Sequence, residues 1–287
     1  MTCHEAWLEA ADGVRLWRRS WLPEGDPAAL VVFVHGFTEH SGRYDHVAEA
    51  LCRRGYAFQA IDLRGHGRSQ GYRAWVRSFD VYVDDVARLL AAACQAHPGK
   101  RTFLVGHSLG GTIVTLLAVD RRPALAGLIL SAPLLKMPNH LFRTLRYLAI
   151  FASRIVPRLR ITSLGARYIS RDPQVVAAFE DDPLVFHGRF PVRTGAEILR
   201  ALRRVRRRME AVELPLLVFH GTGDMVTDPQ GSRQLHARAG SADKTLRLYE
   251  GLYHDLLHEP ERETVLDDLL DWLGARVARS TSRRGDL

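Results

Sequence analysis

Short apolar runs alternate with longer segments of helical periodicity along most of this chain, and that alternation constrains the fold more than any other feature. Runs such as LVVFVHG and LPLLVFHG contain almost no polar residue before their final His-Gly, which is typical of strands buried on both faces of a sheet. Because helical stretches separate the runs, we expect a mostly parallel, twisted sheet with right-handed crossovers. The predicted strands of this set are residues 30–36, 56–62, 102–106, 125–133, 214–221 and 244–251.

The first residues follow a different pattern. Apolar and polar residues alternate on both sides of Asp12 and Gly13, a dipeptide typical of hairpin turns, so we expect two antiparallel strands here. Helical periodicity, ended by Gly55 in one segment and by Pro98 in another, predicts the connecting helices. These are residues 44–54, 80–97, 112–120 and 261–277. The fold class is therefore α/β, and 287 residues suit one large domain or two small ones.

Residues 134–212 break the alternation. This segment is rich in helical periodicity, has no clear strand, and holds fifteen arginines against six acidic residues between positions 137 and 210. It therefore carries the basic excess of a chain whose formal net charge is +8. We predict a helical cap at 134–212, inserted after the sixth strand of a core formed by residues 1–133 and 213–278, with a loose polar tail at 279–287.

One stretch of the predicted cap, residues 141–159, carries apolar residues at helical spacing with Arg143, Arg146, Arg154 and Arg158 between them. Two interpretations stay open: a helix packed on the core with a solvated basic face, or a lid whose apolar side lines an acyl tunnel while its arginines meet anionic interfaces. The arginine-rich run at 203–210 has no aromatic residues between its charges and no binding motif, so no nucleic-acid partner is expected.

The pattern Gly-x-Ser-x-Gly occurs twice, around Ser69 and around Ser108. A nucleophilic serine of this type needs a strand ending just before the pattern and a helix starting at the serine, because the sharp turn exposes the hydroxyl. Ser108 meets both conditions, since TFLV precedes it and LGGTIVTLLAV follows it. Ser69 meets neither, so we predict Ser108 as the nucleophile and place Ser69 in a loop.

A serine hydroxyl needs a neighbouring base held by a third group, and in this fold the chain order is serine, acid, histidine. Asp224 lies in the turn after a late strand and is the predicted acid. Asp228 precedes Pro229 and a helical stretch, which is typical of a helix N-cap. His254 follows the next strand and is the predicted base, whereas His258, one turn later, is interpreted as a surface or helix-entry residue.

An acyl-transfer site also needs backbone N–H groups that stabilise the oxyanion. We assign these to Leu109, directly after the nucleophile, and to Phe37, in the loop after the strand at 30–36. The side chain of Phe37 is then free to shape the pocket. No metal-ligating constellation is present in the sequence, the chemistry needs no cofactor, and Cys3, Cys52 and Cys94 are interpreted as structural or free thiols.

Six segments appear together and in order: HGFTEHSGRY, DLRGHGRSQG, GHSLGG, SAP, HGTGDMVTDP and YHDLLHEPER. As a set they resemble the monoacylglycerol lipase and bacterial lysophospholipase branch of the α/β-hydrolases, which is related to serine aminopeptidases, over about residues 5–277. The resemblance implies an α/β-hydrolase fold, a Ser108-Asp224-His254 triad, oxyanion amides from Phe37 and Leu109, and a cap that carries the acyl-binding wall. The family often has a small residue where this chain has Phe37.

The leading hypothesis is a serine hydrolase that cleaves carboxylic esters of monoacylated lipids through an acyl-enzyme. The alternatives are a short-chain carboxylesterase, thioesterase, peptidase or acyltransferase with the same triad, and a non-enzymatic receptor, which would not require the triad. Phe37 and the cap residues Leu141, Leu145, Leu148 and Phe151 are candidate substrate contacts. The cysteine pattern and the absence of a visible signal peptide or transmembrane run favour a cytoplasmic protein that contacts membranes peripherally through the basic cap.

Overall fold

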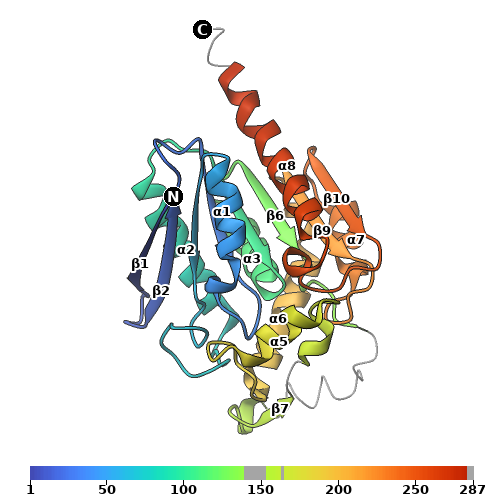
Figure 1. The fold of residues 1–287 in the computed structure, drawn as a ribbon. Helices are drawn as coiled ribbons and strands as arrows, with labels where there is room; N and C mark the ends of the chain where they lie inside the picture. The colour runs from blue at the N-terminus through green and yellow to red at the C-terminus, as the bar shows by residue number, and fades with distance from the viewer. Residues whose placement is uncertain (139–152, 163–164, 283–287) are drawn as a thin grey trace.

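An eight-stranded sheet forms the centre of the molecule, with strand order β1-β2-β4-β3-β5-β6-β9-β10 (Figure 1). The structure is a computed structural model that describes residues 1–138, 153–162 and 165–282. The strands of this sheet are β1 (Thr2–Glu9), β2 (Arg15–Leu22), β3 (Ala29–Val34), β4 (Tyr56–Ile61), β5 (Thr102–His107), β6 (Gly127–Ser131), β9 (Leu216–Gly221) and β10 (Lys244–Tyr249).

The directions of the strands follow the sequence prediction. β1 and β2 form an antiparallel hairpin that closes at the pair Glu9 and Arg15, and Gly13 in its turn has a φ of 79°. β2 is antiparallel to β4, and from β4 to β10 every neighbouring pair is parallel. The mostly parallel sheet is confirmed, and its parallel strands bring their carboxyl ends to one edge of the molecule.

Helices cover both faces of the sheet, as the apolar strands require. Alternate residues of β3 point to opposite faces: Val32 belongs to the hydrophobic cluster that includes residues of α2 and α3, and Val31 to the cluster that includes residues of α1 and α8. The helices of the core are α1 (Asp45–Arg53), α2 (Phe79–Ala96), α3 (Leu109–Arg121), α7 (Pro229–Arg238) and α8 (Arg262–Ser282). Short 3-10 turns are η1 (Ser41–Tyr44), η2 (Ala166–Tyr168), η3 (Met209–Ala211) and η4 (Leu256–His258).

The segment between β6 and β9 differs from the prediction in two respects. It is not without strands, because β7 (Arg160–Thr162) pairs with β8 (Phe190–Pro191) in a small antiparallel sheet. Its helices are α5 (Pro173–Asp181) and α6 (Val192–Arg207), and the apolar face of α6 joins the core cluster that contains α2 and α3. Part of the predicted cap is therefore a layer of the core.

The helix predicted over residues 141–159 lies largely outside the described residues. Residues 153–155 are helical, but Pro157 lies in a turn and Leu159 follows it, so the predicted end of that helix is wrong. At the other end of the chain, α8 continues to Ser282, beyond the core boundary predicted at residue 278. Among the described residues, no helix is both long enough and apolar enough to cross a membrane.

The turn from β5 into α3 explains two glycines of the Gly-x-Ser-x-Gly pattern. A Cβ on Gly110 would overlap the carbonyl oxygens of Val34 and His35, and a Cβ on Gly106 would lie 2.5 Å from the carbonyl oxygen of Gly110. Backbone atoms cannot move aside as a flexible side chain can. Close approach of α3 to β3 and β5 therefore requires glycine at both positions.

This packing gives a prediction about stability. Gly110 and Gly274 both lie inside helices, where alanine is intrinsically better by up to about 1 kcal/mol. Around Gly274 the nearest atom to a new Cβ is the Tyr56 hydroxyl, at 3.7 Å, which is ordinary contact. We expect Gly274→Ala to raise the free energy of unfolding and Gly110→Ala to lower it, measured by urea denaturation. Equal stabilisation by both substitutions would contradict the close packing at Gly110.

Candidate active site

Ser108 lies on the strained turn between β5 and α3. Its φ of 51° and ψ of −116° are unusual for a residue with a side chain, and its neighbours hold it there. The Ser108 N–H donates to the carbonyl of Ser131 at 3.0 Å, and the Ser108 carbonyl accepts from the Leu134 N–H at 2.9 Å. The backbone is thus fixed by two bonds to β6 and the segment after it.

His254 bridges Ser108 and Asp224. Its Nε2 lies 2.9 Å from Ser108 Oγ, and its Nδ1 lies 2.7 Å from Asp224 Oδ2. Asp224 follows β9 and His254 follows β10, so the carboxyl ends of neighbouring parallel strands bring together residues that are far apart in the sequence. All three residues are buried, each less than 8% exposed. The structure therefore joins the three residues that the sequence nominated.

Hydrogen bonds fix the carboxylate of Asp224. Oδ1 accepts from the N–H groups of Val226, at 2.7 Å, and Thr227, at 2.9 Å, and Oδ2 accepts from the Thr227 hydroxyl at 2.7 Å. Burial alone would raise the pKa of Asp224, but His254 and His220 hold it well below its usual range. The carboxylate remains charged and faces the imidazole of His254.

The charge on Asp224 also acts on the histidine. Burial by itself lowers the pKa of His254, but the Asp224 carboxylate outweighs this effect, so the pKa of His254 is raised above its ordinary value. A neutral imidazole whose Nδ1 carries the proton leaves Nε2 free to accept one from Ser108. The arrangement suits a general base that becomes a stabilised imidazolium.

The amides assigned to the oxyanion hole lie in suitable elements. Leu109 is the first residue of α3, and Phe37 lies in the loop after β3. Within the described residues, neither N–H donates to another protein group. Their roles stay predictions.

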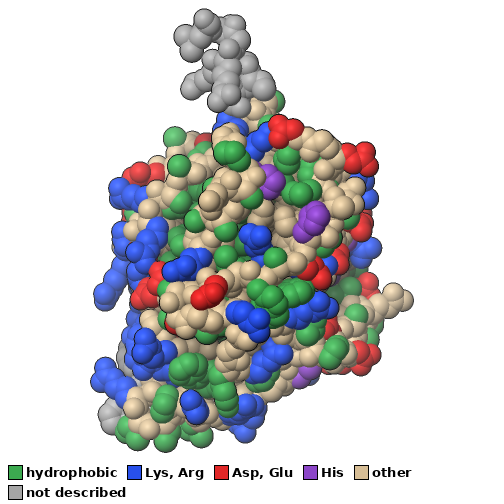
Figure 2. Space-filling view, turned by 90° about the vertical axis from the view of Figure 1, so that its left-hand side faces the viewer, with side chains coloured by type: hydrophobic (Ala, Val, Ile, Leu, Met, Phe, Trp, Pro, Cys, Tyr) green, Lys and Arg blue, Asp and Glu red, His purple; other side chains and the backbone are tan. Residues whose placement is uncertain are grey.

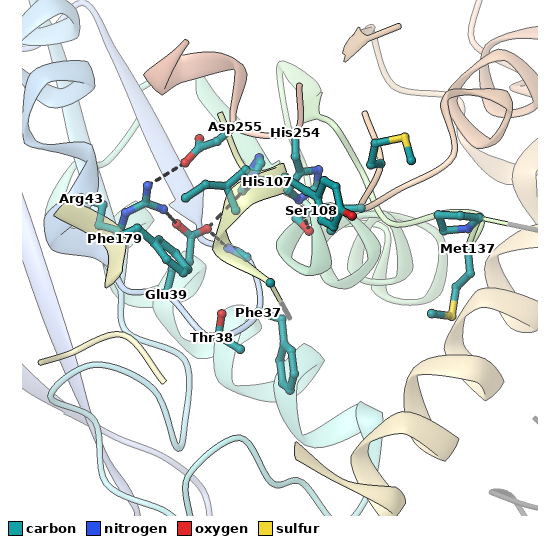
Figure 3. Close-up of a pocket in the computed structure, with 17 residues that line it drawn as sticks. Phe37, Thr38, Glu39, Arg43, His107, Ser108, Met137, Phe179, His254 and Asp255 are labelled. Atoms are coloured by element: carbon teal, nitrogen blue, oxygen red, sulfur yellow. Dashed lines mark hydrogen bonds and ion pairs between the residues drawn. The ribbon is translucent and has the colours of Figure 1, made fainter. Parts of the chain in front are cut away.

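A pocket lies over Ser108 and is apolar on most sides (Figure 3). Figure 3 shows Met137 on one side of Ser108, and Arg43 with Glu39 on the other. The apolar side chains that line it are Phe37, Met137, Pro138, Ile169, Phe179, Met225 and Val226. Of the predicted substrate contacts, Phe37 does line the pocket. Leu141, Leu145, Leu148 and Phe151 lie outside the described residues.

Sequence reasoning missed a group of buried charges at one end of the pocket. Arg43 pairs with Glu39 and, at 2.8 Å, with Asp255, the residue after His254. Burial opposes ionisation of all three, yet the Arg43 guanidinium lowers the pKa of Glu39, and His258 together with Arg43 lowers that of Asp255. The sequence signal for this buried group was the presence of charged residues inside the HGFTEHSGRY and YHDLLHEPER motifs.

His258, interpreted as a surface or helix-entry residue, lies in η4 just before α8 and belongs to the same group, so of the two interpretations that of a surface residue is wrong. Its Nδ1 lies 2.8 Å from Asp255 Oδ1, and its Nε2 lies 2.8 Å from the carbonyl of Arg43. The N-cap interpretation of Asp228 is confirmed by a 2.9 Å bond from the Gln230 N–H. Ser69 lies in a loop, where its hydroxyl donates to the Asp62 carbonyl at 2.5 Å.

Two further buried histidines form hydrogen bonds with protein groups. His35 accepts from the Leu63 N–H at 2.8 Å, and His220 lies 2.6 Å from the Ser232 hydroxyl. Cys3, Cys52 and Cys94 are free thiols. Over the described ranges, no group of histidine, cysteine and acidic side chains has the arrangement of a metal site.

Comparison with known proteins connects this geometry to a family. The family model described as serine aminopeptidase, S33, matches residues 25–261. The monoacylglycerol lipase of Mycolicibacterium smegmatis is 37% identical over 91% of this chain and 93% of its own length. The chain belongs to this family of α/β-hydrolases. The resemblance predicted from the six motifs is confirmed.

Other relatives support the assignment of the chain to this family. The phospholipase YtpA of Bacillus subtilis is 32% identical over 85% of this chain and 95% of its own length. The crystal structure of the Paleococcus ferrophilus monoacylglycerol lipase superimposes with a TM-score of 0.83 at 31% identity, and covers 91% of this chain and 99% of that one. These relatives are named as ester hydrolases, which is the class of enzyme that the sequence predicts.

The contact between Asp224 and His254 predicts a titration. The imidazole is protonated below its pKa, and the Asp224 charge raises that pKa. We expect the pH of half-protonation of His254, followed by NMR of the labelled ring, to lie above about 6.5. It should move to lower pH in Asp224→Asn. Asp228→Asn removes a nearby helix-capping carboxylate and should leave the titration unchanged. The same pKa in all three proteins would contradict the proposed electrostatic coupling.

Proposed function

We propose that this protein hydrolyses carboxylic esters of monoacylated lipids, with Ser108, His254 and Asp224 as its catalytic triad. The observation that carries the proposal is the continuous hydrogen-bonded chain from Asp224 through His254 to Ser108 at the wall of an apolar pocket. Family members named as monoacylglycerol lipases support the substrate class.

The geometry suggests how each group acts. Ser108 Oγ attacks the ester carbonyl while its proton moves to His254 Nε2, 2.9 Å away. The imidazolium that forms lies against the Asp224 carboxylate, and the amides of Leu109 and Phe37 would stabilise the oxyanion. His254 then gives the proton to the leaving alcohol, and the acyl group stays on Ser108. Water, activated by His254, releases the acid and restores the serine.

The shape of the pocket favours an apolar acyl chain on one side of Ser108 and a polar alcohol on the other. On one side of Ser108 lies Met137, an apolar side chain, whereas the other side offers the charged groups of Arg43 and Glu39. Phe37 lines the pocket, and its ring contacts that of Phe190 at 5.4 Å between ring centroids. The triad would serve a short-chain carboxylesterase, thioesterase, peptidase or acyltransferase equally well, so substrate comparison must decide the acyl length, head group and bond type.

The triad assignment predicts which serine matters. Ser108→Ala removes the nucleophile and should lower turnover by roughly 10⁶-fold, with an unchanged circular dichroism spectrum. Ser69→Ala is the matched control, because Ser69 also lies in a Gly-x-Ser-x-Gly pattern, and it should retain turnover. The assay compares a monoacylglycerol, a lysophospholipid, an aminoacyl amide and p-nitrophenyl butyrate. An active Ser108→Ala variant refutes the triad, and preference for the amide or the short ester refutes the substrate class.

We also propose that the protein resides in the cytoplasm and contacts anionic lipid surfaces peripherally through the segment between β6 and β9. Ile155, Val156 and Leu159 are 67%, 47% and 53% exposed, beside Arg154 and Arg158. In Figure 2, hydrophobic and basic side chains are mixed at the lower end of the molecule, the end at which Figure 1 places β7. Exposed aliphatic side chains next to arginines are typical of interfacial contacts.

The surface near β7 therefore gives a prediction about binding to anionic lipid vesicles. A basic residue near an anionic surface contributes about 1 kcal/mol, so replacing Arg154 and Arg158 with Gln should weaken vesicle binding by roughly 30-fold. Turnover of monoacylglycerol in phosphatidylserine vesicles should fall, and raised salt should reduce wild-type turnover in the same way. Turnover of soluble p-nitrophenyl butyrate should not change. Equal losses on both substrates would show that these arginines stabilise the fold instead.

A further inference from the structure

The loop Gly36–His40, here called the oxyanion loop, holds a conformation that its own residues do not favour. Thr38 has a φ of 73°, in the left-handed region that β-branched residues avoid. Thr38 is only 4% exposed, so packing around it fixes this conformation. The amide that the proposed mechanism aims at the oxyanion belongs to Phe37, the preceding residue, and its direction therefore depends on what holds Thr38.

One set of restraints comes from the loop itself and from the residue before it. The Gly36 N–H donates to Glu39 Oε1 at 2.5 Å, so the side chain of Glu39 folds back over the loop. His35 Nδ1 lies 2.7 Å from the Gly36 carbonyl. Both contacts restrain the start of the loop at Gly36, and neither reaches the backbone of Thr38.

The restraint on Thr38 comes from the segment between β6 and β9. The Phe186 N–H donates to the Thr38 carbonyl at 2.8 Å. On either side of this bond the same segment makes two further contacts with the loop. The rings of Phe37 and Phe190 meet edge to face, and His40 Nε2 lies 2.8 Å from Asp182 Oδ2. Residues 182–190 therefore contact the oxyanion loop at three successive points.

The contact between His40 and Asp182 has a defined donor. His40 Nδ1 accepts from the Gly42 N–H at 3.1 Å and so carries no proton, which places the proton on Nε2 and makes it the donor to Asp182. The other oxygen of Asp182, Oδ1, accepts from the Leu184 N–H at 2.8 Å. Each oxygen of the carboxylate thus has its own donor, and the carboxylate joins the loop to the turn that leads to Phe186.

We propose that Asp182 and His40 are positioning residues for the oxyanion hole: their bond holds residues 182–190 against the oxyanion loop so that the Phe37 amide points at the reacting carbonyl oxygen. The proposal rests on the triad and oxyanion assignments made above. Neither side chain touches the substrate, and both act through the backbone of Thr38. When the bond is lost, the strained Thr38 relaxes and the Phe37 amide turns away from the position where negative charge develops.

The proposal is tested with Asp182→Asn, which keeps the size of the side chain. Asparagine has one acceptor oxygen, so it can serve Leu184 but then presents an NH₂ group to the N–H of His40. We expect kcat for p-nitrophenyl butyrate to fall by roughly 10-fold with KM unchanged, less than the 10²–10³ that complete loss of one oxyanion donor costs. Affinity for an alkyl trifluoromethyl ketone, which forms an oxyanion on Ser108, should fall by the same factor. Affinity for the unfluorinated ketone should not change.

Three further variants complete the experiment. Asp172→Asn is the matched control, because Asp172 caps α5 in the same segment, accepting from the Gln174 N–H at 2.8 Å, and does not touch the loop. It should leave kcat within about twofold of wild type, since asparagine is an equally good N-cap. His40→Asn can still accept from Gly42 but cannot reach Asp182, so it should match Asp182→Asn. The double variant should have the same kcat as either single variant, because all three lack the same bond between residues 40 and 182.

Two results would overturn the proposal. If Asp182→Asn and His40→Asn lose no more kcat than Asp172→Asn, the bond only attaches the segment to the core. If KM rises instead, or both ketones lose affinity equally, the contact shapes the substrate pocket and not the oxyanion hole. Ser108→Ala is measured in parallel, and an active Ser108→Ala variant would overturn the triad itself, which separates failure of the proposed function from failure of this inference.

Discussion

The close contact of α3 with β3 and β5 is the constraint on which the candidate site depends. Since Gly106 and Gly110 lack side chains, a single residue can separate the end of β5 from the start of α3, and Ser108 occupies this strained turn. That turn fixes the hydroxyl at the carboxyl edge of the sheet. The loops that hold Asp224 and His254 reach the same edge because β9 and β10 are parallel to β5 through the intervening β6.

Buried charge is the second organising feature of this edge. The carboxylates of Asp224, Asp255 and Glu39 all raise the pKa of His254, and Arg43 pairs with the latter two. A histidine in an apolar site would be a weaker base, since burial disfavours its cation. The network connects the oxyanion loop with the loop of His254, so the two halves of the proposed chemistry share one electrostatic environment.

The segment between β6 and β9 is more than a cover over the pocket. α6 adds its apolar face to the core, whereas residues 182–190 contact the oxyanion loop. Because the segment is attached both to the core and to the oxyanion loop, a change in its conformation would alter the backbone of Thr38. Its sequence can therefore affect catalysis without supplying a group that touches the substrate.

The sequence alone determined the order along the chain of the main-sheet strands and the core helices, Ser108 as the serine of the strand-to-helix turn, and the nomination of Asp224 and His254, because periodicity and glycine spacing are local properties. The tertiary structure decided what depends on contacts between distant residues. Arg43 meets Asp255 across more than two hundred residues, and α6 packs into the core instead of a separate cap. β7 and β8 escaped prediction because such short strands carry no periodicity, and only their pairing defines them.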